Sequence, residues 1–201
     1  MLIFGLNKRW HFTAIYEHLE AIGEQIELGK IKAKGKGLFN RDDQGEDWWN
    51  LRVCAYYTEF NKEKIVWGNI AYHSTFCYAA QGEFITAPAN LLTSSSNDIK
   101  YLLGCMNSKI FNWEFVNLGI PLGYAFEWKK QYVELIHVPS ITDENLEIAE
   151  QIEGIVVQIL TAKKADPETD TTAFENEIDK LVYTLYDLTP KEIAIVEVAA
   201  E

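Results

Sequence analysis

Residues 101–139 read YLLGCMNSKIFNWEFVNLGIPLGYAFEWKKQYVELIHVP and carry the features from which the fold is predicted. The apolar positions of the first half indicate a helix over about residues 98–116, with Asn107, Ser108 and Lys109 on it. A glycine-rich loop and a pair of lysines follow this helix. Residues 134–139 are then expected to form a short apolar strand that ends at Pro139.

Upstream of this stretch, a helical segment is followed by segments typical of strands. Residues 13–27 are amphipathic and predict a helix. Residues 64–72 and 75–79 are rich in Ile, Val, Phe and Tyr, which favours strands. Gln81-Gly82 signals a turn, so we expect residues 83–87 to complete a hairpin.

Downstream of Pro139 the pattern becomes helical. Helices are expected to begin at Thr142, at the Thr172–Glu175 capping box and at Thr189-Pro190. The sequence thus predicts an α+β fold. A β-rich region over residues 1–139 is flanked by helices, and an acidic helical segment over residues 140–201 packs on it as one unit.

The charge of the chain is unevenly distributed. The formal net charge is −12 at pH 7. Residues 1–139 hold 14 basic and 15 acidic residues, whereas residues 140–201 hold 4 and 15. Polyanions are bound through Lys and Arg, so a nucleic-acid surface is expected only in the near-neutral front part.

The composition excludes several other classes. There is no run of 18 apolar residues, which argues against a membrane span. Cys54, Cys77 and Cys105 are too widely spaced for a zinc ribbon, and we expect buried free thiols in a reducing cytoplasm.

Several segments together resemble the TaqI-like C-terminal specificity domain, the target recognition part of adenine-specific DNA methyltransferases and type II restriction enzymes. In that family a helix similar to YLLALLNSK leads to a strand similar to K-x-Y-I-E-x-L-P-I-P. WWNLR at 48–52, KIVWGNIA at 64–71 and the tail from Asp170 to Glu197 also look like the family. The matching residues of the central stretch are Tyr101, Leu102, Leu103, Asn107, Ser108, Lys109, Lys130, Tyr132, Glu134 and Pro139.

The resemblance implies sequence-specific recognition of double-stranded DNA for a restriction-modification enzyme. The chain has no adjacent prolines, so it lacks the Asn/Asp-Pro-Pro-Tyr/Phe motif that holds a flipped adenine. It also lacks a D-x-E-x-K nuclease sequence, and its histidines lack metal-ligand spacing. We therefore expect no catalytic residue, metal or cofactor in this chain. S-adenosylmethionine, and Mg²⁺ if a nuclease is present, are implied for a methyltransferase or endonuclease catalytic region on the same or a partner chain.

The candidate DNA-binding residues are basic residues in loops. Alternating lysines between glycines suit a phosphate backbone, and they equally suit a solubilising loop. Arg52 beside two tryptophans suits guanine recognition or packing on an aromatic face. His73 stands between two expected strands, where the family often has basic residues. The candidates are Lys30, Lys32, Lys34, Lys36, Arg41, Arg52, His73, Lys129 and Lys130.

A second hypothesis comes from another class of function. In it the chain is a protein-interaction module whose working surface is the set of acidic C-terminal helices, and DNA is not contacted. The salt dependence of duplex binding distinguishes the two.

Overall fold

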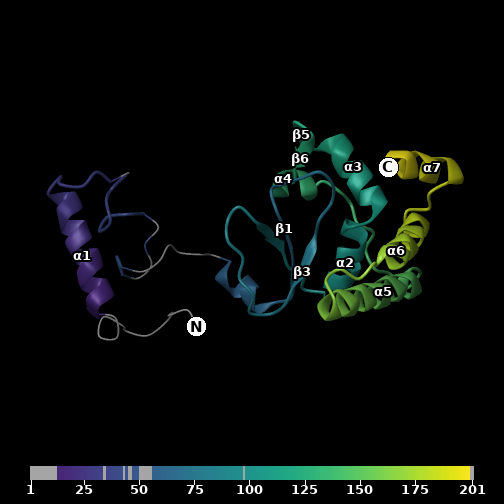
Figure 1. Ribbon diagram of the computed structural model, residues 1–201, viewed down its shortest axis with the longest axis horizontal. Helices are drawn as coiled ribbons and strands as arrows, with labels where there is room; N and C mark the ends of the chain where they lie inside the picture. The colour runs from purple at the N-terminus through teal and green to yellow at the C-terminus, as the bar shows by residue number, and fades with distance from the viewer. Residues whose placement is uncertain are drawn as a thin grey trace. The chain divides into compact units, whose positions relative to one another are not determined.

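The computed structural model describes residues 13–33, 35–42, 44, 47–49, 56–96 and 98–199. The chain divides into two compact units, residues 1–56 and 57–201. Figure 1 traces their helices and strands. Helices and antiparallel strands occupy separate stretches of the second unit, which confirms the α+β class. The division of the chain at residue 139 stays a prediction.

The first unit is organised around helix α1, Thr13–Glu27, as the sequence predicts. Gly23 is buried because the Phe39 ring lies over it, and a Cβ there would come within 2.3 Å of that ring. Phe39 meets Trp48 edge-on with ring centroids 4.7 Å apart. The ring centroids of Tyr16 and Trp48 lie 5.3 Å apart. Aromatic packing therefore holds α1 against the turns that follow it.

The second unit begins with a short 3-10 helix, Tyr57–Asn61, and a three-stranded antiparallel sheet. Its central strand is β1, Lys64–Trp67, which lies between β3, Cys77–Ala79, and β4, Asn90–Leu92. Ile65 in β1 is fully buried, so this sheet contributes directly to the core.

The prediction of a hairpin strand at residues 83–87 is wrong, because these residues do not form a strand. The Gln81-Gly82 turn forms, but the Glu83 carboxylate accepts a hydrogen bond from Ala80 N at 2.8 Å and closes the turn on itself. The chain then leaves β3 and returns on the other side of β1 as β4. Pairing with β1 thus replaces the expected pairing with β3.

The predicted strand at residues 64–72 is divided between two sheets. After β1, Gly68 and Asn69 interrupt it, and β2, Ile70–Ala71, joins a second antiparallel sheet in the order β2-β6-β5. The break is held by Trp128: its backbone N–H donates to Asn69 O at 2.8 Å, and its carbonyl accepts from Trp67 Nε1 at 2.6 Å. The other strands are β5, Ile120–Leu122, and β6, Ala125–Glu127.

The single helix predicted over residues 98–116 is two helices, α2, Ile99–Met106, and α3, Lys109–Leu118. Asn107 interrupts them because its side chain bonds the backbone of Phe76. Its Oδ1 accepts from Phe76 N at 3.0 Å and its Nδ2 donates to Phe76 O at 2.9 Å. Ser108 then caps α3 by accepting from Phe111 N.

Replacement of Asn107 by Ala is expected to destabilise the fold by about 1–3 kcal/mol, because both backbone groups of Phe76 lose their partner. Urea unfolding followed by circular dichroism measures the loss. Asn117→Ala is the control, since Asn117 is exposed and its Nδ2 donates only to Trp113 O within its own helix. An unchanged midpoint for Asn107→Ala would show that this side chain does not support the junction.

The apolar strand predicted before Pro139 is also wrong. Residues Lys130–Val133 form the short helix α4, and a further turn follows. Val133 and Ile136 are buried while Leu135 is 54% exposed, a spacing of helical type rather than alternation. His137 is exposed and not packed in a strand, and its carbonyl accepts a 2.5 Å hydrogen bond from Tyr186 Oη.

Three helices complete the second unit: α5, Leu146–Ala165, α6, Thr172–Leu185, and α7, Pro190–Ala199. Helix α5 packs along α2 at Gly104, where a Cβ would come within 2.5 Å of Ile152 Cγ2 (Figure 1). The absence of a side chain at Gly104 therefore allows the close approach of the two helices. Buried residues of both helices belong to one continuous core with the first sheet.

The helix starts agree only partly with prediction. Thr189 and Glu192 form the expected capping box of α7, with Thr189 N donating to Glu192 Oε2 at 2.8 Å. Helix α5 begins at Leu146 rather than Thr142, since Thr142 N donates to Asn145 Oδ1 in a preceding turn. Helix α6 has Thr171 rather than Thr172 at its cap position, and Thr171 Oγ1 donates a hydrogen bond to Glu175 Oε1 at 2.7 Å.

Candidate nucleic-acid interface

A glycine- and lysine-rich loop follows α1 in the first unit. Gly35 and Gly37 have φ values of 73° and 77°, a conformation that side chains disfavour, so glycine is required on both sides of Lys36. Lys36 bonds Asp42 at 2.5 Å, but the two side chains are 63% and 79% exposed. Such an exposed pair contributes little and is readily exchanged. The described lysines of this loop, all exposed, are Lys30, Lys32 and Lys36.

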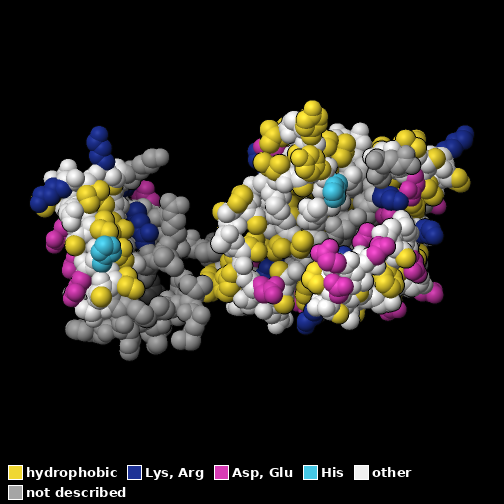
Figure 2. Space-filling model, in the orientation of Figure 1, with side chains coloured by type: hydrophobic (Ala, Val, Ile, Leu, Met, Phe, Trp, Pro, Cys, Tyr) yellow, Lys and Arg dark blue, Asp and Glu magenta, His cyan; other side chains and the backbone are white. Residues whose placement is uncertain are grey.

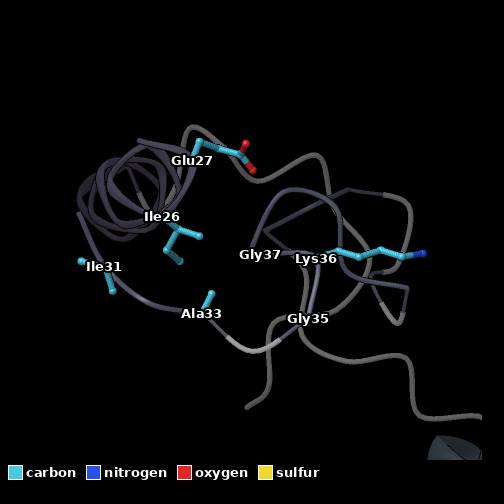
Figure 3. A pocket seen from close by; sticks show the side chains of 7 residues that line it. All are labelled: Ile26, Glu27, Ile31, Ala33, Gly35, Lys36 and Gly37. Atoms are coloured by element: carbon cyan, nitrogen blue, oxygen red, sulfur yellow. The ribbon is translucent and has the colours of Figure 1, made fainter. Parts of the chain in front are cut away.

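A shallow depression of about 290 Å³ lies beside this loop. Figure 3 shows Ile26, Ile31 and Ala33 around it, with the Lys36 side chain extending away from them. Polar atoms make up most of the surface of the depression, and the ammonium group of Lys36 is directed outward.

Arg41 lies at the edge of the aromatic cluster of the first unit. It is half-buried, and its Nη2 donates to Trp48 O at 3.4 Å. Trp48 and Trp49 pack edge-on, with centroids 5.7 Å apart, and both rings contact Tyr16. These tryptophans thus serve the packing of the first unit. Arg52 and Lys34 lie outside the described residues.

The candidates of the second unit flank the sheet β2-β6-β5, which has the shorter strands and is called the smaller sheet below. His73 is exposed and follows β2. Lys129 and Lys130 follow β6 and are matched by acids: Lys129 Nζ lies 2.7 Å from Glu127, and Lys130 Nζ lies 3.7 Å from Glu134. The hydrogen bond to Glu127 raises the pKa of Lys129 above its ordinary value. A phosphate would have to compete with the partly buried Glu127 for Lys129, whereas the Lys130–Glu134 pair, with side chains 80% and 55% exposed, is as readily exchanged as the Lys36–Asp42 pair.

The structure gives prominence to a residue that sequence reasoning did not select. Tyr124 is 94% exposed at the turn between β5 and β6, next to Gly123 with φ of 64°. The sequence predicts only a loop there, and the turn signal Gly123-Tyr124 between two short apolar segments was the available clue. A fully exposed tyrosine can stack on a base or pack on a protein surface.

The Asn107-Ser108-Lys109 sequence has a structural role. Lys109 N donates to Asp179 Oδ1 at 2.9 Å, and Lys109 Nζ lies 2.7 Å from Glu197. The hydrogen bond to Glu197 raises the pKa of Lys109. These contacts attach α6 and α7 to the start of α3, so this motif connects the helices.

Metal-ligand clusters and membrane-spanning helices are absent from the described part of the chain. No group of three or more His, Cys, Asp and Glu side chains there is arranged to hold a metal ion. None of the helices in the described ranges is long and apolar enough to cross a membrane.

Comparison with known proteins agrees with the resemblance noted in the sequence. The family model of the TaqI-like C-terminal specificity domain matches residues 15–138. No match was found among curated proteins. The matched range runs from α1 through both sheets to the residue before Pro139, and thus includes the glycine- and lysine-rich loop and the β5–β6 turn. The chain belongs to the family of TaqI-like C-terminal specificity domains.

Proposed function

We propose that this chain recognises the target sequence of double-stranded DNA for an adenine-specific methyltransferase of a restriction-modification system. The observation that carries the proposal is the family match over residues 15–138. The methyl transfer, its S-adenosylmethionine and any Mg²⁺-dependent cleavage belong to a catalytic region on the same or a partner chain. That region would act on a flipped adenine while this chain holds the duplex in place.

The proposed contacts divide into two kinds. The exposed lysines of the first-unit loop contact phosphates, which positions the duplex without reading its sequence. Arg41 is proposed to join these lysines at the phosphates, and Arg52 and His73 are proposed to read base edges. Lys129 contributes less, because its ammonium group lies 2.7 Å from the partly buried Glu127 carboxylate, whereas the exposed Lys130–Glu134 pair is readily exchanged.

The uneven charge supports an arrangement in which DNA meets the front part of the chain. Residues 140–201 carry 15 acidic and 4 basic residues, so this segment repels a polyanion. The same observation favours the second candidate function, a protein-interaction module that uses the acidic helices α5 to α7.

The test is duplex binding at two salt concentrations. We expect weak binding, with a dissociation constant of roughly 10⁻⁴ to 10⁻⁶ M for non-specific duplex, and a strong loss of affinity between about 50 and 200 mM salt. Fluorescence anisotropy of labelled duplexes measures the affinity at each salt concentration. A preferred site is first selected from a pool of random-sequence duplexes. Absence of binding at low salt would favour the interaction module instead.

A further inference from the structure

Residues 72–76 form a loop that joins β2 of the smaller sheet to β3 of the other sheet, and two asparagines hold its backbone. Asn107 bonds both the N–H and the C=O of Phe76. Asn112, one turn into α3, accepts a hydrogen bond from Ser74 N through its Oδ1 at 2.9 Å. Phe76 is only 5% exposed and belongs to the core. The loop is therefore fixed at two positions that lie two residues apart.

The remaining side chains of this loop point to solvent. Tyr72 is 69% exposed, and His73 and Thr75 are exposed as well. Within the described ranges none of these three side chains takes part in a hydrogen bond or an ion pair. Polar side chains on a backbone that is already fixed lose less conformational freedom on binding than those of a mobile loop. The loop is thus prepared to form hydrogen bonds with a ligand.

The charge around the loop indicates which part of a duplex it suits. Residues 65–82 contain no Asp, Glu, Lys or Arg. Figure 2 shows the acidic side chains of the second unit gathered mainly over α5 and α6. Phosphates are bound through cations, whereas base edges are bound through hydrogen bonds and through contact with the thymine methyl group. The hydroxyl and imidazole groups of the loop and the methyl group of Thr75 provide contacts of the second kind.

We propose that Tyr72, His73 and Thr75 form a base-reading loop and that Asn112 is its positioning residue, acting through the N–H of Ser74. The inference rests on the proposed function and extends it, since His73 was the only candidate in this loop. A side chain that distinguishes bases has to be held within about 0.5 Å of its productive position. The hydrogen bond from Ser74 supplies this restraint directly beside His73.

The experiment measures the affinity of the complete chain for its preferred duplex and for a random duplex by anisotropy. Asn112→Ala removes the acceptor for Ser74, and we expect roughly tenfold weaker binding of the preferred duplex only. Asn112→Asp keeps the acceptor oxygen and adds a negative charge, so both duplexes should lose affinity by one factor and the preference should be kept. Asn117→Ala is the control, because Asn117 Nδ2 donates only to Trp113 O in the same helix.

Two further measurements show whether Asn112 acts through the loop. Amide hydrogen exchange of Ser74, followed by NMR, should be faster in Asn112→Ala than in Asn117→Ala, while circular dichroism shows that both are folded. His73→Ala should weaken the preference in the unchanged chain and should have a smaller effect in the Asn112→Ala background, since the loop is already released there.

A folded Asn112→Ala variant that keeps its preference between duplexes would overturn the proposal. So would an equal loss on both duplexes, or independent, additive effects of His73→Ala and Asn112→Ala. If Asn112→Ala does not fold, the exposed variants His73→Ala and Thr75→Ala decide, and normal preference in both would overturn the base-reading loop. An unchanged chain that prefers no duplex would instead count against the proposed function.

Discussion

Replacement of Trp128 by Ala is expected to lower the free energy of unfolding by about 3–5 kcal/mol. Trp128 is 2% exposed and stacks on Phe115 with ring centroids 3.5 Å apart. Its Nε1 donates to Ala71 O at 3.1 Å, and its backbone links β1 to the smaller sheet. The substitution creates a cavity where the two sheets meet. Urea unfolding followed by circular dichroism measures the loss.

Two matched variants separate the causes. Trp128→Phe keeps an aromatic ring for Phe115 but removes the Nε1 donor, and a smaller loss of about 1–3 kcal/mol is expected because the Ala71 carbonyl loses its partner. Tyr124→Ala removes an aromatic ring that is 94% exposed, and should change stability by less than about 0.5 kcal/mol. Equal stability of Trp128→Ala and Tyr124→Ala would contradict the packing described for the second unit.

The combined variant Lys30→Ala/Lys32→Ala/Lys36→Ala is expected to bind every duplex more weakly by a similar factor. Phosphate contacts carry no sequence information, so the preference between duplexes should be kept. The slope of log affinity against log salt should become flatter by roughly one for each phosphate that the variant no longer binds. Anisotropy titrations over a salt series, on a preferred and a random duplex, measure both quantities.

The control for the lysine variant is Lys163→Ala/Lys164→Ala, at the end of the acidic helix α5. These exposed lysines lie in the segment that should avoid DNA, so their loss should leave the salt slope unchanged. Lys129→Ala gives a second comparison, since its ammonium is already paired with Glu127 and its removal should have a small effect. Losses of affinity in proportion to the three, two and one charges that the variants remove would mean that net charge alone, not the first-unit loop, controls binding.

The local sequence determined the helices whose start signal and buried face are formed by residues close together in the chain. Helix α1 forms over residues 13–27 as predicted, and Thr189 and Glu192 begin α7 through a capping box. Both depend on interactions between near neighbours, which a sequence pattern contains. The α+β class and the family were also predictable, because they rest on the order of such segments along the chain.

Tertiary interactions decided where the long predicted elements break. Asn107 ends α2 because Phe76, far away in the chain, offers its backbone N–H and C=O. Trp128 similarly divides the strand after Trp67, and buried Val133 and Ile136 turn an expected strand into helix α4 with a following turn. In each case an isolated segment can form either structure at nearly equal cost, so a partner distant in sequence decides between them.

Some features of the candidate interface were likewise identifiable from the sequence, and others were not. The lysines between glycines were identifiable because their conformation is set by adjacent residues. The sequence did not reveal that Lys129 pairs with Glu127, or that Ile70, Ile120 and Leu122 are exposed on one face. Both depend on the register of β2, β6 and β5, which brings residue 70 beside residues 120 and 127. Sequence by itself determined which residues are charged or apolar, and the pairing of distant strands decided which of them face a partner, because a shift of one residue turns each side chain to the other face.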